Sequence, residues 1–203
     1  MANNNSLPYE IIAAPFTVWY APVGTAFPDV EETPPSPWAK VGSSGDLNYM
    51  DDGVTVSHRQ TMELFRALGD AGSRKAFRTE EDLLIKLNLA DLTLEQYKHA
   101  LNGNTVTTVP AATNAGYKWV GLSRGFSVDT VALLVRGPSP YGAAWALQYE
   151  CPRAAQTGNP EVVMRKGTPA SLALEWTALV DPDALTEAER FGRILAQHAD
   201  AAT

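Results

Sequence analysis

The 203-residue sequence predicts a mainly β domain of antiparallel sheets, on which one internal and one C-terminal α-helix pack. Three observations lead to this prediction. Several segments alternate apolar and polar residues, as strands with one buried face do. Glycine, proline and asparagine separate these segments, as expected for connections between strands. Two further segments begin with the spacing of a helix capping box, in which a Ser or Thr precedes a Glu or Gln by three positions.

The N-terminal part of the chain predicts an arm, a strand and a long loop. Residues 1–15 are polar and then mixed in character, and we expect them to form an N-terminal arm. Residues 15–24, PFTVWYAPVG, are rich in aromatic and β-branched residues and predict the first strand. Residues 26–38 combine several prolines with an acidic patch, which excludes regular structure. A loop of this length usually has a function or is ordered by a partner.

The middle of the chain predicts a long β-hairpin followed by a helix. Asp52 and Gly53 predict a turn, after which residues 54–64 alternate as a strand, and residues 64–77 form the hairpin tip loop. The helix begins at Thr93, three residues before Gln96, and Gly103 occupies the position of a left-handed C-terminal cap. The returning strand has one apolar face, and Leu84 interrupts its polar face; the apolar face consists of Leu83, Ile85, Leu87 and Leu89.

The C-terminal half predicts five more strands and a final helix. The strand candidates are residues 118–122, 126–135, 143–151, 161–166 and 170–180. Thr186 and Glu189 form the second capping box, and apolar residues follow at helical spacing, so we expect a helix over 186–199. The whole chain is predicted to be a single domain, residues 1–203, without internal repeats.

Composition narrows the class of protein. The chain is 45% hydrophobic, which is enough for a real core, and its formal net charge is -7. That charge argues against a surface that grips nucleic acid or an anionic membrane. Cys151 is the single cysteine and is expected in the core, so no intramolecular disulfide is possible. Without a signal-peptide pattern or an apolar run near the ~20 residues that span a bilayer, we expect a soluble chain made in a cytoplasm.

One motif resembles that of an enzyme. Residues 121–125, GLSRG, fit the pattern around the nucleophile of serine hydrolases, where the serine lies on a sharp turn from a strand into a helix. Here the next segment, FSVDTVALLV, alternates as a strand, so an ordinary turn around Ser123 is the expected structure. Hydrolysis by Ser123 remains an alternative on the sequence alone.

Other candidate sites lack the necessary spacing. No two of the three histidines are spaced to bind zinc together, and the glycine-rich residues 69–75 lack the spacing of a phosphate-binding loop. An oxygen-rich cluster near residues 46–52 lacks the pattern of a calcium-binding loop. The sequence therefore predicts no enzyme, no catalytic residue, no metal site and no cofactor. The histidines are His58, His99 and His198.

The predicted strands give the remaining indication of function. Four long strands each have one apolar face and one polar face. A polar face can simply be solvated, as is common in antiparallel sheets. It can also line a passage that forms when several subunits join their sheets. The polar faces contain Glu63, Lys86, Asn88, Gln148, Glu150 and Glu175.

The sequence resembles the major tail (tail tube) proteins of long, non-contractile-tailed bacteriophages over most of its length, from about residue 15 to 199. The resemblance rests on several stretches in order. These are APVGTAFP with its proline-rich acidic loop, GDLNYMDDGVTVSH, FRALGDAGSRKAFRTEE, LTLEQYKHALNG, GLSRG and GNPEVVMRKGTPASLALEWTALVDP before the terminal segment.

The resemblance implies a tail-tube fold, with β-sandwich or barrel-like sheets and a flanking helix. It also implies a structural virion protein located in the tail and assembled in the host cytoplasm. Six subunits would form a ring with a continuous inner β-barrel, and rings would stack into a tube around a tape-measure protein, with terminator and tip proteins as further partners. DNA would pass through the lumen into the host without specific binding, and no membrane would be involved.

The resemblance implies roles for particular residues. The polar face residues Glu63, Lys86, Asn88, Gln148, Glu150 and Glu175 would face the lumen. A wall with few basic groups would bind DNA phosphates weakly. Loops would connect neighbouring rings, and the basic hairpin tip could complement the acidic loop. The expected ring-to-ring contacts are Asp29, Glu31, Glu32, Gly69, Asp70, Arg74 and Lys75.

Two alternatives to this function remain from the sequence. One is a carbohydrate-binding β-sandwich module, whose aromatic residues Trp19, Tyr20 and Trp38 would hold a sugar. The other is the tube protein of a contractile injection system, which shares the expected fold.

Overall fold

The computed structural model describes residues 7–112 and 115–198. The chain is mainly β, with 44% of residues in strands and 9% in helices, and this confirms the predicted class. The strands are β1 (Thr17–Pro22), β2 (Ala39–Lys40), β3 (Tyr49–Arg66), β4 (Ser73–Leu89), β5 (Thr107–Val109), β6 (Tyr117–Trp119), β7 (Thr130–Pro138), β8 (Ala146–Gln156), β9 (Leu172–Ala178) and β10 (Arg193–Ala196). The helical elements are η1 (Pro8–Glu10), η2 (Gly45–Asn48), α1 (Leu94–Tyr97), η3 (Lys98–Leu101) and η4 (Glu187–Glu189).

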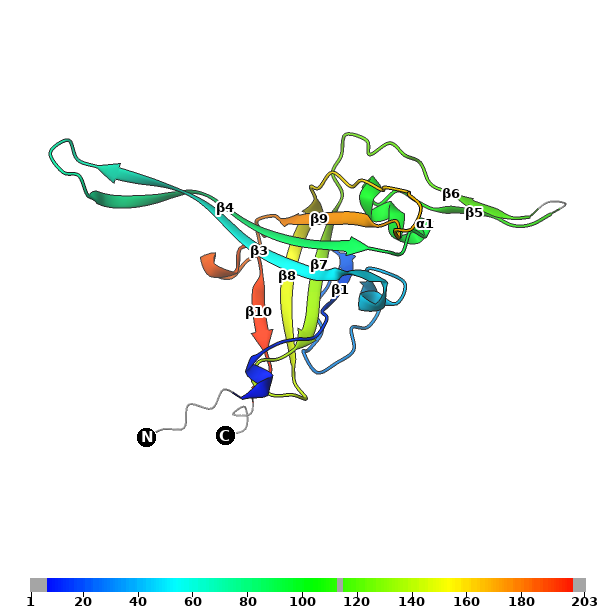
Figure 1. Cartoon of the computed structure of the whole chain (residues 1–203), viewed down its shortest axis with the longest axis horizontal. Coiled ribbons are helices and arrows are strands. Elements are labelled where there is room, and N and C mark those ends of the chain that lie inside the picture. The colour runs from blue at the N-terminus through cyan, green and yellow to red at the C-terminus, as the bar shows by residue number, and fades with distance from the viewer. Residues whose placement is uncertain (1–6, 113–114, 199–203) are drawn as a thin grey trace.

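Antiparallel pairing joins eight strands into one sheet, in the order β2-β1-β7-β8-β9-β4-β3, with β10 added beside β8. The sheet forks at β8. Residues 147–150 of β8 pair with β10, whereas residues 154–156 pair with β9. The fork lets β9, β4 and β3 fold across β1, β7 and β8, so that two layers face each other (Figure 1).

The core lies between these two layers. It combines Val18 of β1, Leu133 of β7 and Cys151 of β8 with Ile85 of β4 and Trp176 of β9, all nearly inaccessible to solvent. Each fully buried aliphatic side chain of this kind contributes about 1.5–3 kcal/mol to folding. The apolar face predicted for residues 83–89 is therefore confirmed, and Cys151 is buried as expected.

The long hairpin has a different local structure from the one expected. Asp52 and Gly53 do not reverse the chain, because β3 continues through them with an irregular register and a positive φ of 63° at Gly53. A glycine tolerates this conformation without steric cost. Both strands also extend beyond their predicted ends, to Arg66 and from Ser73, so the connecting loop is 67–72 and not 64–77.

The internal helix is shorter than predicted. Only Leu94–Tyr97 is α-helical, and a 3₁₀ turn over Lys98–Leu101 completes it. The capping-box interpretation of Thr93 is wrong, since its side chain makes no capping hydrogen bond. Asp91 instead accepts from the backbone N–H of Thr93 at 3.0 Å. The left-handed end begins one residue early, with φ of 59° at Asn102 and 71° at Gly103.

The predicted C-terminal helix over 186–199 is wrong within the described residues, which end at 198. Glu187–Glu189 form a single 3₁₀ turn, and Arg193–Ala196 pair with β8 as strand β10. Gly192, with φ of 111°, redirects the chain between them. The apolar residues Ile194 and Leu195 therefore belong to a strand and not to one face of a helix. Residues 161–166 likewise form no strand, apart from two isolated bridges, Val162 with Leu172 and Arg165 with Thr168.

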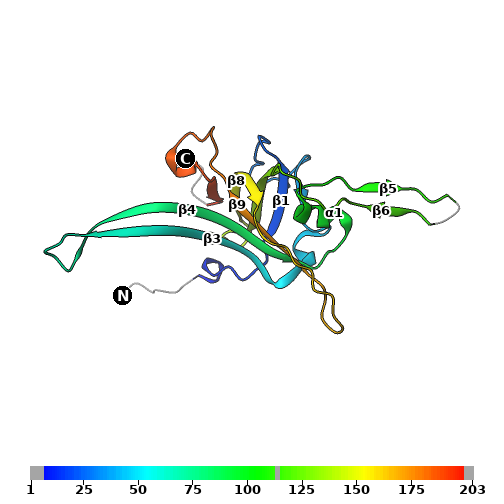
Figure 2. The same ribbon diagram turned by 90° about the horizontal axis from the view of Figure 1, so that it is seen from above.

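Two hairpins project from the body in opposite directions (Figures 1 and 2). We call the outer part of the β3–β4 hairpin, residues 59–82, the long arm. We call the segment that carries β5 and β6, residues 104–129, the short arm. Among the described residues, the helices are too short to cross a membrane.

Candidate assembly surfaces

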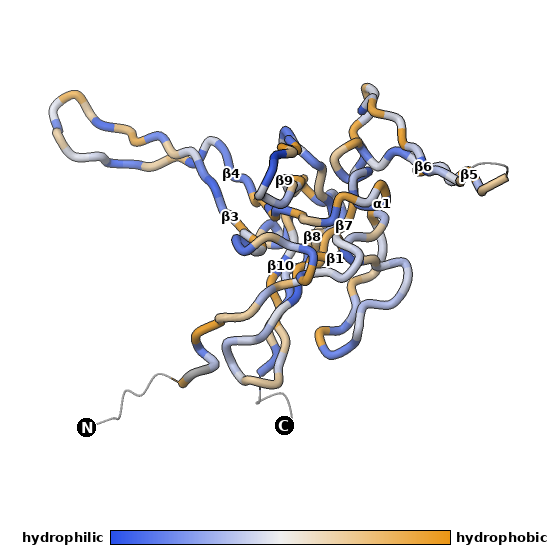
Figure 3. Tube along the Cα trace, turned by 45° about the vertical axis from the view of Figure 1, so that its right-hand side comes forward, coloured by the Kyte–Doolittle hydropathy of each residue, from blue (hydrophilic) through white to orange (hydrophobic). Residues whose placement is uncertain are grey.

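The long arm exposes large apolar side chains on both of its faces. Met62, Leu64, Phe65, Leu68 and Phe77 are all at least 46% exposed, and Leu68 at the tip is fully exposed. Figure 3 shows these hydrophobic segments along the arm, beyond the body of the protein. A two-stranded hairpin alone is marginally stable in water, and exposed apolar groups of this kind usually mark an interaction surface.

The tip of the long arm is basic and locally organised. Asp70 accepts a hydrogen bond from Nε of Arg74 at 3.1 Å, and from the backbone of Gly72 at 2.9 Å. These two hydrogen bonds lower the pKa of Asp70. Lys75 lies over the ring of Phe77 at 4.9 Å. Gly69, Asp70, Arg74 and Lys75, expected at a contact between rings, are therefore all exposed at the end of the projection.

The outer edge of β3 is free. This strand has 18 residues and ends the sheet, with β4 as its only neighbour among the described strands. Unpaired backbone N–H and C=O groups along such an edge are a template for pairing with another chain. The edge therefore offers a second surface on which copies of the chain could join.

Four of the six predicted lumen residues lie on the polar face of β3, β4 and β9. Lys86 forms a cross-strand ion pair with Glu175, and the side chain of Asn88 donates to that of Asp52. Strand alternation puts Glu63 on the same face, farther out along the arm, where it is exposed. The ion pair offsets the charge of Lys86, and exposed Arg59 adds a further positive charge to the same face. Leu84 lies in this face and is buried, next to Ser57 and Thr177 in the strand register.

The lumen prediction is wrong for Gln148 and Glu150. Both lie on β8 and are buried, at 0% and 4% exposure, beneath the proline-rich loop. The side-chain amide of Gln148 donates to the backbone oxygen of Pro28 at 3.1 Å and to Glu150 at 2.6 Å. Polar residues alternate with apolar ones in a strand whether its polar face is open to solvent or covered by a loop. The alternating pattern therefore could not show that Gln148 and Glu150 are buried.

Arg136 holds that loop in place, and sequence patterns gave no sign of this role. Its guanidinium donates to the side-chain oxygen of Gln148 at 3.0 Å and to the backbone oxygen of Asp29 at 2.9 Å, and it also contacts that of Glu32. Burial lowers the pKa of Arg136, while the charge of Glu150 opposes that effect. A fixed guanidinium that satisfies several oxygens is well suited to ordering a loop.

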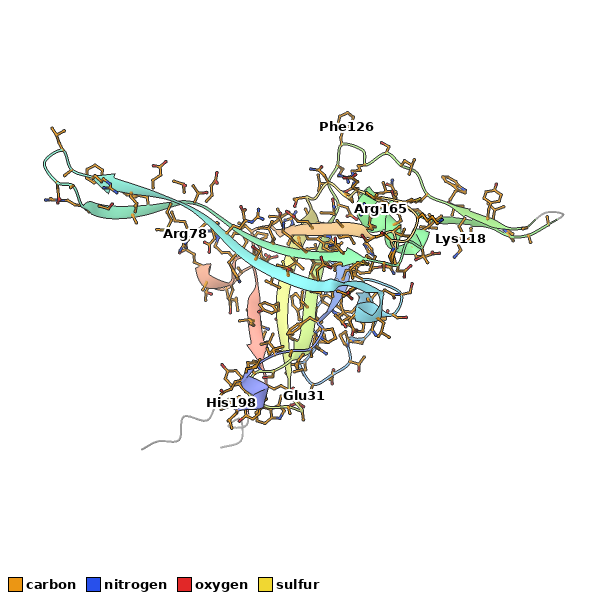
Figure 4. All side chains as sticks on the ribbon, in the orientation of Figure 1. Glu31, Arg78, Lys118, Phe126, Arg165 and His198 are labelled. Atoms are coloured by element: carbon orange, nitrogen blue, oxygen red, sulfur yellow. The ribbon has the colours of Figure 1, made fainter. Side chains whose placement is uncertain are left out.

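The acidic residues of the proline-rich loop lie far from the tip of the long arm in the same molecule. Glu31 accepts from the side chain of Gln197 at 3.1 Å, at the opposite end of the body (Figure 4). The side chains of Asp29 and Glu32 are exposed. The structure therefore does not bring the two predicted ring-contact groups together within one chain.

The short arm provides a third exposed apolar surface. Tyr117, Trp119, Leu122 and Phe126 are at least 52% exposed, and Phe126 points away from the body in Figure 4. Lys118 forms an ion pair with Glu95 of α1 at 2.6 Å. Sequence patterns predict a strand here but no projection. The apolar residues of this segment do not alternate with polar ones in a regular way. That irregularity is the sequence signal that could have indicated a projecting arm.

The environment of Ser123 is unsuitable for a nucleophile. Its hydroxyl accepts a hydrogen bond from the backbone of Gly125 at 3.4 Å, and the chain continues into strand β7 and not into a helix. In the described part of the chain, no group of three metal-ligating residues comes together either. His99 is buried against Tyr20, His58 is exposed, and His198 packs against Tyr141.

The aromatic residues considered for carbohydrate binding do not form an open platform. Trp38 is 5% exposed, packs against Phe27, and donates from its ring nitrogen to the backbone oxygen of Ala26 at 3.0 Å. Tyr20 stacks edge-on against His99 at 4.4 Å, and Trp19 lies in the same covered region as Trp38. Trp19, Tyr20 and Trp38 therefore pack against neighbouring side chains of the protein.

Comparison of the sequence with models of known protein families and with curated proteins finds no match to either.

Proposed function

We propose that this chain is a structural subunit that assembles with copies of itself into the tail tube of a long, non-contractile-tailed bacteriophage. In this proposal six copies form a ring with the tail-tube fold, and stacked rings form the conduit for viral DNA. The tube would assemble around a tape-measure protein and end at terminator and tip proteins. The sequence resemblance suggests these partners and the virion location.

The long arm is the observation that carries this proposal. This hairpin carries large apolar side chains exposed on both of its faces. Such groups are normally removed from water, and the described part of the chain leaves them uncovered. Contact with another copy would bury them.

Two further features support assembly into a tube. The free edge of β3 could continue a sheet from one copy to the next, which would remove the exposed edge. The polar face with the Lys86–Glu175 ion pair has few unpaired basic groups, so it could line a DNA passage without retaining phosphate.

Negative-stain electron microscopy of the purified chain, at increasing concentration, tests the proposal. Rings or hollow tubes should form without any added partner. Particles that remain monomeric at all concentrations would exclude self-assembly. Binding to a glycan array, without assembly, would favour the carbohydrate-binding alternative.

A further inference from the structure

A groove opens where the sheet forks at β8. Its walls are the base of the long arm on one side and the segment from η4 to β10 on the other, and its volume is about 540 Å³. Figure 1 shows this segment beneath β3 and β4, and Figure 4 places Arg78 of the arm above it. Pockets that hold small ligands span ~300–1,000 Å³, so the groove can accept several side chains.

The groove has an apolar floor. Val56 and Leu83 come from the arm base, Tyr149 from β8, and Phe191 and Ile194 from the C-terminal segment. Ile194 is 56% exposed, so this side of β10 has no cover among the described residues. Burying it against an apolar occupant would stabilise a complex, because it removes apolar surface from water.

The rim of the groove is acidic. Glu81, Asp82, Glu150 and Glu189 line it, together with His58 and Arg193. Glu81 is paired with Arg78 of the arm at 3.3 Å. Arg193 is already paired with Glu150 at 2.7 Å. Asp82 and Glu189 form no ion pair with a described residue. The groove therefore suits an occupant that is apolar and positively charged.

The tip of the long arm has this chemistry. Phe65 and Leu68 are exposed, and Arg66, Arg74 and Lys75 surround them with only Asp70 as a counter-charge. A tip cannot reach the groove of its own molecule, because the groove is formed by the base of the same arm and the arm leads away from it (Figure 2). The matching groove must belong to another copy.

We propose that the tip of the long arm of one copy inserts into the fork groove of the next copy. This inference rests on the proposed function, and it replaces the proline-rich loop as the receptor of the tip. Such a contact joins two different surfaces, so it repeats from copy to copy and produces rings or helical tubes. Apolar contact would provide affinity, and the opposite charges would select the register.

Zero-length cross-linking tests the contact directly. A disulfide needs two Cα atoms about 4.4–6.8 Å apart, so it reports close contact. Leu68→Cys at the tip and Ile194→Cys in the groove would be made as separate chains with different tags, mixed, and oxidised. The native Cys151 will not interfere, because it is buried and burial raises its pKa to about 12. A third chain, Leu47→Cys, is the matched control, since Leu47 is 83% exposed on η2 and outside the groove.

The expected result is a mixed disulfide between the Leu68→Cys and Ile194→Cys chains, several-fold more abundant than that between Leu68→Cys and Leu47→Cys. Equal yields from tubes visible by microscopy would overturn the groove as receptor and leave the tube proposal standing. Equal yields from a chain that never assembles would overturn both. A specific mixed disulfide without tubes would support the contact and contradict the tube.

Charge exchange gives a second, independent test. Reversing the tip with Arg74→Glu and Lys75→Glu should reduce assembly at least several-fold, and unchanged assembly would contradict the contact. Adding Asp82→Lys and Glu189→Lys should restore it. Restoration by Asp29→Lys, Glu31→Lys and Glu32→Lys instead would identify the proline-rich loop as the receptor and overturn the inference.

Discussion

The Nε atom of Arg193 lies 2.7 Å from Oε2 of Glu150, and this contact attaches the last strand of the fold to the buried face of β8. The Glu150 side chain is 3% exposed, while that of Arg193 is 55% exposed. The contact raises the pKa of Arg193 through the hydrogen bond and the charge of Glu150. It also forms part of the fork groove, so the strand and the proposed docking site depend on the same pair.

Replacement of Arg193 by methionine should destabilise the protein. The variant retains an apolar stem but leaves the Glu150 carboxylate with Gln148 as its only described side-chain donor. A buried acceptor that loses a partner costs about 1–3 kcal/mol. Urea unfolding should show this loss, and the double variant Glu150→Gln, Arg193→Met should recover most of it. Equal stability of the single variant and the wild type would show that the pair contributes nothing.

Replacement of Arg136 by lysine should loosen the proline-rich loop. The planar guanidinium reaches Gln148 and the backbone oxygens of Asp29 and Glu32 together, whereas a lysine ammonium cannot span all three. Hydrogen exchange followed by mass spectrometry should show faster exchange over residues 27–37. Arg124→Lys is the matched control, because Arg124 is exposed in a loop before β7. Unchanged exchange over the loop would mean that the prolines alone order it.

Stability should fall as the pH is lowered from about 6.5 toward 4. His99 is buried and its Nε2 has no hydrogen-bond partner, and burial, with Lys98 nearby, lowers its pKa to about 4. Within this window the unfolded chain binds a proton that the folded chain excludes, so the loss is on the order of 3 kcal/mol. Thermal unfolding at several pH values should show it, and His99→Phe should remove it.

A separate loss at lower pH provides an internal control for His99. Burial alone would raise the pKa of Asp91, but hydrogen bonds from Ser43 and Thr93 lower it to about 2. Its stabilising contribution is therefore present above pH 3.8 and is lost as the pH falls toward 2. The His99→Phe variant should keep this second loss. A variant that retained the full loss between pH 6.5 and 4 would exclude His99 as its source.

Gly192→Ala should damage the β8–β10 pairing. At φ of 111°, an added Cβ would lie 1.8 Å from the backbone oxygen of Glu150, so the strand must move. Overpacking of this kind costs about 1–3 kcal/mol, in addition to the backbone strain. Gly125→Ala is the control, because Gly125 also has a positive φ, 68°, but no atom lies within 4 Å of the added Cβ. Its cost should be only about 1 kcal/mol. Equal melting temperatures for the two variants would contradict this account.

The strands could be predicted from the sequence because their burial follows the local pattern. Ile85 and Leu87 face the core, as does Trp176, each at its expected phase. The C-terminal helix could not be predicted correctly, because the capping-box spacing at Thr186 produces no side-chain capping hydrogen bond and only a single 3₁₀ turn follows it. The conformation of the chain after that turn is decided by Gly192 and by pairing of Ile194 with Tyr149, a partner 45 positions earlier in the chain.

The candidate surfaces likewise include some that the sequence could predict and some that it could not. Lys86 and Glu175 could be assigned to one polar face because both lie on strands whose alternation is regular. Gln148 could not be assigned, since the loop that covers it reaches across 120 positions to Pro28. Sequence patterns do not identify the apolar residues of the long arm as an assembly signal. Met62 and Leu64 continue the alternation of Val54, which packs against the core, so they read as further core residues.

Sedimentation velocity of the wild-type chain beside an arm-shortened chain tests the central claim most directly. Residues 62–79 would be replaced by Asn-Gly, a sequence that favours a tight two-residue turn between the paired Thr61 and Glu80. The long arm makes few buried contacts, so the shortened chain should fold and unfold at nearly the same urea concentration as the wild type. We expect large assemblies from the wild type and monomers from the shortened chain. The account would be contradicted if the wild-type chain were also monomeric, or if both chains formed equally large assemblies.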